Sequence, residues 1–220
     1  MFRKFVFQRL ETINDYKNNG YKKENPKRNL IKVCFIDDRG FNTDVFRSTG
    51  YTNVDTMLDY KNSNEVAGYD IIACDIDGIG LNLDRKRQGL AVAETIIAAF
   101  PEKVVLIYSS NNPYEYDENY HSVGDGWFNK SLSNNEIAKI FDEKAAVMFD
   151  EIAAWGKIEK ILRRDNISNK TIAYIEDLYV KSLKKKVNLF ENNGSNFLKI
   201  VKEIPGVMMS IVSIIARFIK

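Results

Sequence analysis

Histidine, cysteine and proline are scarce in this sequence, and their scarcity excludes several kinds of site. The only histidine among the 220 residues is His121, which stands in a polar stretch, so a Ser-His-Asp triad is not expected. Cys34 and Cys74 both fall within apolar runs, and their spacing predicts neither a disulfide framework nor a metal site. Buried thiols of this kind are typical of a reducing compartment, so we expect a cytoplasmic protein.

The sequence also has no strong net charge, and we expect neither a secretory signal nor a membrane-spanning helix in it. The formal net charge is +2, and the basic stretches Tyr21–Arg28 and Lys181–Lys186 are interpreted as solvated faces or linker, so no nucleic-acid partner is predicted. The first ten residues, MFRKFVFQRL, have charges inside their apolar portion and no small-residue cleavage site. No run reaches the roughly 20 apolar residues that a spanning helix needs.

What remains is the composition of an ordinary soluble protein, with 45% hydrophobic and 28% charged residues. A chain of this length can form one well-packed domain plus an extension. The patterns divide it into an N-terminal helix and linker over residues 1–29, an α/β domain over 30–150, and a helical segment over 151–220.

The α/β domain is organised around the stretch Tyr69–Gly80, which reads YDIIACDIDGIG. Its apolar run, Ile71–Cys74, predicts a strand buried on both faces, as in a parallel sheet. Asp75 ends this strand and is followed by a glycine-rich turn. Ligands of such sheets bind at the carboxyl ends of the strands, where a reactive carboxylate is useful.

Four more strands are predicted, and helical or polar segments separate them. The strands cover Ile31–Ile36, Asn53–Leu58, Lys103–Tyr108 and Gly126–Asn129. Helices are expected at Thr43–Ser48, Gln88–Phe100 and after the capping box Ser133–Glu136, while residues 59–68 and 111–125 leave room only for brief or frayed helices. This alternation predicts a five-stranded, parallel, doubly wound sheet of the flavodoxin-like type.

The carboxyl edge of that sheet would gather five polar side chains, each of which follows a predicted strand: Asp37, Asp38, Asp75, Ser109 and Lys130. Neighbouring carboxylates repel one another unless a cation neutralises them. Mg²⁺ is bound by one or two carboxylates together with waters and phosphate oxygens, so it fits this set. The backbone carbonyl of Asp77 is a further candidate ligand.

The chemistry of these groups suits phosphoryl transfer. A carboxylate such as Asp75 can accept a phosphoryl group, while Mg²⁺ neutralises the transferring oxygens. Lys130 can pair with one phosphoryl oxygen and the Ser109 hydroxyl can hydrogen-bond another. Movement of Ser109 toward a new phosphoryl group would be a local event with a wider effect, which is how a switch works.

Four motifs lie at the strand ends: FIDD, CD, LIYSS and WFNK. With them, residues of about 31–150 resemble a response-regulator receiver domain, CheY-like but divergent. The resemblance implies Asp75 as phosphoacceptor, Asp37 and Asp38 as the acid pair, Lys130 as the phosphate-pairing lysine, and Ser109 and Trp127 as switch residues. It also implies Mg²⁺, two-component signalling, a sensor histidine kinase or phosphotransfer protein as partner, and no enzymatic activity beyond autophosphatase.

The sequence departs from the receiver pattern in three places. Ser131 follows Lys130 where receivers usually have a proline, and no Met-Pro follows Asp75. The segment after Asp75 is lengthened by Asp84–Arg87, which lies beside the expected site. These departures leave open a second reading, a phosphate-independent pseudo-receiver that acts as an interaction and oligomerisation module.

A third reading starts from the DIDG motif, which also resembles the first motif of haloacid-dehalogenase-type phosphatases. Asp75 would then be the nucleophile and Asp77 the general acid. Two observations count against it: the region past Asp150 reads helical, so the acidic pair that should follow a later strand is missing, and the Asp37-Asp38 pair has no role.

The ends of the chain read as helices. Apolar spacing predicts a short amphipathic helix in the first 14 residues, and one long helix from Glu136 to about Arg164, or alternatively a break near Gly156. Further helices are expected over Lys170–Lys185 and Asn196–Ile204.

The last apolar segment, Val207–Ile219, is too short to cross a bilayer. Three environments remain open for it: an oligomer core, its own domain, or shallow insertion in a membrane, which is the least favoured. We expect a homo-oligomer formed through the C-terminal helices.

Overall fold

The structure is a computed structural model that describes residues 9–23, 25–115, 117–192 and 205–219. Its contacts form two compact units. Glu24–Phe149 is the first, called here the α/β unit. The described residues of Met1–Lys23 and Asp150–Lys220 form the second, called the helical unit.

The α/β unit contains one sheet of five parallel strands in the order β2-β1-β3-β4-β5. The strands are β1 (Lys32–Ile36), β2 (Asn53–Met57), β3 (Ile71–Asp75), β4 (Val104–Ser109) and β5 (Trp127–Asn129). Every residue of β3 and β4 is buried, as expected for strands covered on both faces. The predicted flavodoxin-like sheet is therefore confirmed.

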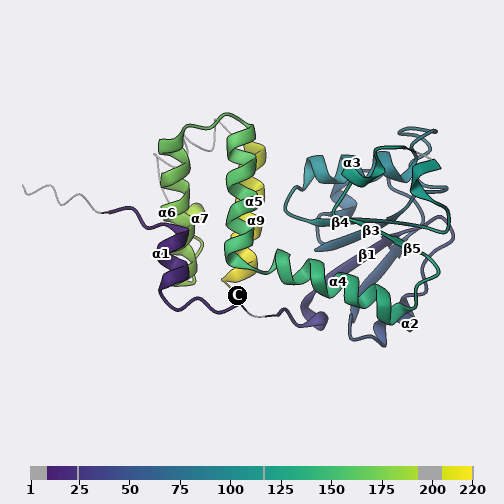
Figure 1. Cartoon of the computed structure of the whole chain (residues 1–220), viewed down its shortest axis with the longest axis horizontal. Helices are drawn as coiled ribbons and strands as arrows, with labels where there is room; N and C mark the ends of the chain where they lie inside the picture. The colour runs from purple at the N-terminus through teal and green to yellow at the C-terminus, as the bar shows by residue number, and fades with distance from the viewer. Residues whose placement is uncertain (1–8, 24, 116, 193–204, 220) are drawn as a thin grey trace, which may run out of the picture. The chain divides into compact units, whose positions relative to one another are not determined.

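Helices cover both faces of this sheet (Figure 1). On one face, α2 (Thr43–Arg47) and α4 (Asn134–Met148) enclose a core rich in aromatic rings, with Phe35, Phe46 and Phe141 among its members. On the other face, α3 (Gly89–Ala99) packs over an aliphatic core. In the crossovers before β3 and before β5, the helical elements among the described residues are 3₁₀ turns, Ser63–Val66, Pro113–Glu115 and Tyr120–Ser122, in agreement with their polar sequences.

The helical unit is formed by both ends of the described chain. It contains α1 (Ile13–Asn18), α5 (Glu151–Arg164), α6 (Asn169–Lys185), α7 (Leu189–Asn192) and α9 (Pro205–Phe218). Helix α1 contacts α5 and α6, and α9 packs on the same two helices. The sequence patterns predict boundaries at 29/30 and 150/151, whereas the contacts divide the chain at 23/24 and 149/150 and join its two ends in one unit.

The prediction of one helix running from Glu136 to Arg164 is wrong, and so is the alternative of a break near Gly156. Helix α4 ends at Met148 and α5 begins at Glu151. The carboxylate of Asp150 caps α5 by accepting hydrogen bonds from the amides of Ile152 and Ala153 at 2.9 Å. Because the apolar spacing continues across this cap, periodicity alone does not reveal the break.

The N-terminal helix lies further along the chain than predicted. Residues 9–12 are not helical, and α1 starts only after Thr12, while residues 1–8 of the predicted helix lie outside the described residues. Thr12 and Asp15 form a capping box in which each side chain accepts the other's backbone amide. This capping box sets the start of α1.

The apolar C-terminal segment packs within its own unit. Ile211, Ile214 and Ile215 of α9 are fully or almost fully buried in a cluster with α5 and α6. Among the described residues, no helix is long and apolar enough to span a membrane. The predicted helix over Asn196–Ile204 lies outside the described residues.

Candidate functional site

The three predicted acidic residues lie together at the carboxyl edge of the sheet. Asp37 and Asp38 follow β1, and Asp75 ends the neighbouring strand β3. One carboxylate oxygen from each residue lies within 4.8 Å of the other two. Asp37 and Asp75 are buried while Asp38 is exposed, so the cluster opens to solvent on one side.

Lys130, the residue after β5, reaches back to this cluster. Its Nζ donates to Asp37 Oδ2 at 2.8 Å and also to Asp75 Oδ2. The lysine is therefore brought together with the acidic residues, as the sequence predicts. One positive charge is shared between two buried carboxylates, and a third carboxylate lies beside them.

This sharing separates the pKa values of the two buried carboxyls. Burial raises the pKa of Asp37, but hydrogen bonds from Lys130, Tyr108 and the Arg39 amide outweigh it, so the net shift is downward. For Asp75, burial dominates over the interaction with Lys130, and its pKa is raised. Burial alone would lower the pKa of Lys130, but its two carboxylate partners raise it. The lysine therefore stays charged at neutral pH.

Short backbone contacts orient both carboxylates. Asp37 Oδ1 accepts from the amide of Arg39 at 2.9 Å, and Asp75 Oδ1 accepts from its neighbour Ile76 at 2.8 Å. Gly89, the first residue of α3, packs so closely on the Asp75 carbonyl that an added Cβ would lie 1.7 Å from the oxygen. The start of α3 thus supports the backbone that presents Asp75.

Gly78 forms another wall of the site. Its φ is +80°, and a Cβ at this position would lie 2.5 Å from the carboxylate carbon of Asp38. Glycine is therefore required both by the backbone conformation and by the space beside Asp38. Such close approach keeps the loop that carries the Asp77 carbonyl next to the acidic cluster.

The side chains of the two predicted switch residues have partners other than Lys130 and the aspartates. Ser109 is fully buried, and its hydroxyl oxygen accepts from the amide of Asn111 at 3.0 Å. Trp127 is 38% exposed, and its ring packs edge-on against Tyr120 at 6.4 Å between centroids. In this state Ser109 is bonded to the loop after β4 rather than to Asp75.

Sequence reasoning missed Tyr108, which the structure places inside the site. Its hydroxyl donates to Asp37 Oδ2 at 2.8 Å, and the Lys130 ammonium lies 5.0 Å from its ring centroid. The only sequence signal was a tyrosine at the end of a strand predicted to be buried, since a buried tyrosine hydroxyl usually needs a partner.

The inserted segment Asp84–Arg87 is fixed to the surrounding loops. Arg87 donates to Glu94 on α3, at 2.6 and 2.7 Å, and to Asp117 in the loop after β4, at 2.9 Å. In the same region, Asn111 Nδ2 donates to Asp77 Oδ2 at 3.2 Å. The two loops that border the acidic cluster are therefore connected at two points.

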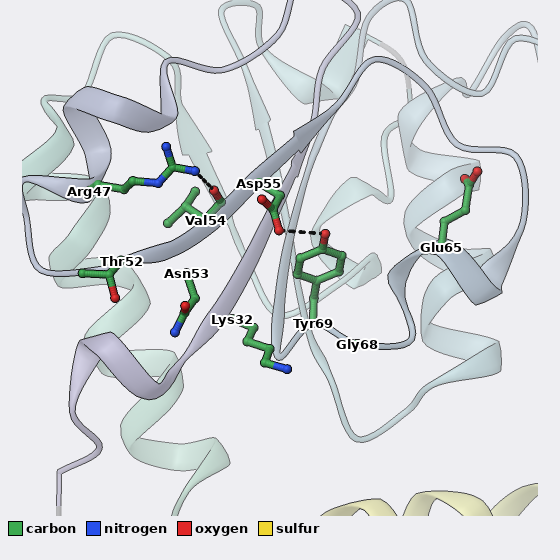
Figure 2. A pocket seen from close by; sticks show the side chains of 9 residues that line it. All are labelled: Lys32, Arg47, Thr52, Asn53, Val54, Asp55, Glu65, Gly68 and Tyr69. Atoms are coloured by element: carbon green, nitrogen blue, oxygen red, sulfur yellow. Dashed lines mark hydrogen bonds between the residues drawn. The ribbon is translucent and has the colours of Figure 1, made fainter.

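A separate pocket of about 470 Å³ lies at the β2 edge of the sheet (Figure 2). Figure 2 shows Arg47 donating to the backbone carbonyl of Val54, while Tyr69 donates to Asp55 at 2.9 Å. The Arg47 side chain thereby takes up the hydrogen-bonding capacity of the Val54 carbonyl on the open side of the edge strand β2, which limits pairing of β2 with another strand. Arg47, Asp55 and Tyr69 thus bond to groups of the pocket itself, whereas the acidic cluster gathers unbalanced charge, so the cluster is the candidate site.

The residues of the acidic cluster fit Mg²⁺. Carboxylate oxygens are hard ligands of the kind this ion prefers, and Asp38 faces solvent, where bound waters could complete an octahedron. The lysine leaves two of three negative charges uncompensated, which matches the charge of one divalent cation. Asp37, Asp38 and Asp75 would hold it, with the Asp77 carbonyl as the further predicted ligand.

Comparison with solved structures returns receiver domains and response regulators. A CheY-like receiver domain from Methanospirillum hungatei JF-1 is 13% identical, with a TM-score of 0.39, and covers 54% of this chain and 95% of that one. Full-length FixJ from B. japonicum is 12% identical, with a TM-score of 0.44 and coverages of 84% and 96%.

RcsB from Salmonella typhimurium is 16% identical, with a TM-score of 0.39, and covers 79% of this chain and 98% of that one. No family model and no curated protein sequence matches the chain. At these identities the likeness concerns the fold alone, and the strand order and site geometry above carry the argument.

Proposed function

We propose that the α/β unit is a Mg²⁺-dependent phosphoacceptor in two-component-type signalling. One observation carries this proposal: Asp37, Asp38, Asp75 and Lys130, which follow three different strands, converge at the carboxyl edge of a receiver-like sheet. Two buried carboxylates and an exposed third one share a single lysine, which is electrostatically costly. A ligand that supplies positive charge, together with a phosphoryl group that uses the lysine, would explain the arrangement.

In the proposed reaction, an Asp75 carboxylate oxygen forms a bond to phosphorus as the bond from phosphorus to the donor breaks. The donor is a phosphohistidine of a sensor kinase or phosphotransfer protein, and the product is an acyl phosphate on Asp75. Bound Mg²⁺ would neutralise charge on the transferring oxygens. Lys130 would exchange its bond to Asp75 Oδ2 for one to a phosphoryl oxygen, and hydrolysis of the acyl phosphate would be the only turnover.

Output would follow from the hydroxyl of Ser109. To reach a phosphoryl oxygen, Ser109 would give up its bond with the Asn111 amide, which would loosen the start of the loop after β4 that also carries Tyr120, the partner of Trp127. This rearrangement is the proposed signal to the helical unit, through which the chain would form homo-oligomers.

A phosphate-independent pseudo-receiver is the second candidate. The observation that favours it is the reduction of two crossovers to 3₁₀ turns, together with the Arg87 contacts that tie the inserted segment to a neighbouring loop. The phosphatase reading is weaker, because the described residues beyond Asp150 contain helices and no strand that would carry its second acidic pair.

The deciding experiment is intact mass spectrometry after incubation with acetyl phosphate, with and without Mg²⁺. Wild type should gain one phosphoryl group only with Mg²⁺, and Asp75→Asn should gain none. Asp77→Asn is the matched control, because it changes a nearby aspartate whose side chain is not the acceptor. No adduct on folded wild type would favour the pseudo-receiver, whereas steady hydrolysis of free phosphoesters would favour the phosphatase.

A further inference from the structure

Tyr108 is held rigidly against Asp37. It is 1% exposed, and its ring stacks on Phe128 at 5.2 Å and meets Phe35 edge-on at 5.7 Å between centroids. Because the ring is enclosed, its hydroxyl has little freedom beyond rotation of the proton. The bond of 2.8 Å to Asp37 Oδ2 is therefore a fixed feature of the site.

This bond completes the hydrogen bonding of one carboxylate oxygen. An ionised carboxylate offers about four lone-pair positions, two on each oxygen. On Asp37, Oδ2 accepts from both Tyr108 and Lys130, and Oδ1 accepts from the Arg39 amide. A single position remains, and it is on Oδ1. Asp37 can therefore offer a cation, or a water bound to a cation, only one oxygen.

Coordination through one oxygen discriminates between divalent cations. Mg²⁺ requires a compact octahedron and commonly takes carboxylates through one oxygen, whereas the larger Ca²⁺ takes 6–8 oxygens and often binds both oxygens of a carboxylate. On the basis of the Mg²⁺ site in the proposed function, we propose that Tyr108 is a specificity-determining residue that disfavours Ca²⁺ by keeping Asp37 Oδ2 occupied.

The other two carboxylates do not impose this restriction as strongly. Asp75 accepts one hydrogen bond on each oxygen, from the Ile76 amide and from Lys130, so each of its oxygens keeps an open position. Asp38 is exposed. Asp37 is the member of the cluster with a fully occupied oxygen. Of the two donors to that oxygen, Tyr108 is the neutral one and Lys130 is the charged one.

The test is isothermal titration calorimetry of the full chain with Mg²⁺ alone and with Ca²⁺ alone. Wild type should prefer Mg²⁺. Tyr108→Phe keeps the ring and removes the hydroxyl, so the ratio of the Ca²⁺ to the Mg²⁺ dissociation constant should fall about tenfold, the effect of one hydrogen bond to a charged group. Near-UV circular dichroism confirms that the variant is folded.

The matched control is Tyr51→Phe. Tyr51 is fully buried in the same aromatic core, and its hydroxyl also donates to a carboxylate, Asp142 Oδ1, at 3.0 Å. Tyr51→Phe should leave the ratio of the Ca²⁺ to the Mg²⁺ dissociation constant unchanged, because Asp142 is not part of the acidic cluster. If Tyr108 had a purely structural role, Tyr108→Phe would weaken the binding of Mg²⁺ and Ca²⁺ equally and leave the ratio of their dissociation constants unchanged.

An unchanged ratio in Tyr108→Phe, with Mg²⁺ still bound, would overturn the specificity proposal and leave the proposed function standing. A shifted ratio without any acetyl-phosphate adduct on wild type would support the specificity proposal and overturn the phosphoacceptor function. Failure of wild type to bind either cation would overturn the cation site and Tyr108's role together.

Discussion

Two buried aspartates, one in each unit, show how differently a carboxylate can be used. Asp177 on α6 is 3% exposed and accepts from Lys181 at 2.7 Å and from the Glu11 amide at 2.8 Å. Asp75 is equally buried, but it shares its lysine with Asp37 and lies beside Asp38. The first carboxylate has its own cation, and the second competes for one. The two aspartates are therefore equally buried but differ in charge balance, and the proposed function rests on the unbalanced charge around Asp75.

The largest expected loss of stability follows from removal of Asp177, the carboxylate that has its own cation. Asp177→Ala should destabilise the helical unit by about 3 kcal/mol, because it leaves Lys181 and the Glu11 amide without their buried acceptor. Each unit has one of the two tryptophans, Trp127 and Trp155, so urea unfolding in a Trp127→Phe background reports the helical unit through Trp155.

The control for Asp177 is Glu159→Ala, which removes another carboxylate paired at spacing i,i+4, here with Arg163 on the surface of α5. Its loss should stay below about 0.5 kcal/mol. Equal losses in the two variants would contradict the structural role assigned to Asp177.

The second effect concerns the wall of the acidic site. Gly78→Ala should cost about 2 kcal/mol in the α/β unit and weaken Mg²⁺ binding, because the new methyl group meets Asp38 and the backbone has a φ of +80°. Calorimetric Mg²⁺ titration and thermal unfolding measure both. Gly68→Ala, where an added Cβ meets no atom within 4 Å, should change neither. Full Mg²⁺ affinity in Gly78→Ala would refute the contact.

The third prediction is a gain in stability on removal of a buried carboxylate, whereas the first is a loss. Since the pKa of Asp75 is raised in the folded state, its ionisation costs stability as pH rises above the ordinary aspartate pKa of 3.8 and through the folded pKa. Asp75→Asn removes that cost and should stabilise the α/β unit by about 1 kcal/mol at pH 7, with little effect near pH 3. Urea unfolding in a Trp155→Phe background, followed by Trp127 fluorescence at both pH values, measures this change. Destabilisation by Asp75→Asn at pH 7 would contradict the view that the Asp75 charge is poorly compensated.

The smallest effect is on the loops that border the site. Arg87→Ala removes the bonds to Glu94 and Asp117 and should cost about 0.5–1 kcal/mol, because these groups are partly exposed. Hydrogen exchange should become faster in residues 111–125. Arg85→Ala, on an exposed neighbour in the same segment, should leave exchange unchanged. Equal hydrogen-exchange rates of residues 111–125 in the two variants would mean that Arg87 does not hold the loops together.

The sequence predicts the acidic site well because parallel strands bring their carboxyl ends to one edge. The positions of Asp37, Asp75 and Lys130 followed from strand ends alone. Tyr108 was missed because a strand pattern does not show where a buried hydroxyl points.

The helical unit was harder to predict because its decisive contacts are long-range or lie at helix caps. The bond from the Glu11 amide to Asp177 joins residues far apart in sequence, and Asp150 looks like an interior helix residue until its cap is seen. Apolar spacing correctly predicted α6, where no cap interrupts the pattern.

The pairing of the two chain ends has a consequence for synthesis. The segment of α1 donates the amides of Glu11 and Ile13 to Asp177 and Glu176, and Tyr16 donates to Glu151, yet these acceptors are translated only after the whole α/β unit. During synthesis, α1 cannot form these contacts until its partners have been translated, whereas all five strands of the sheet are already present and can fold. The α/β unit is thus an insertion within a discontinuous unit, and we expect the helical unit to be the last part of the described chain to assemble.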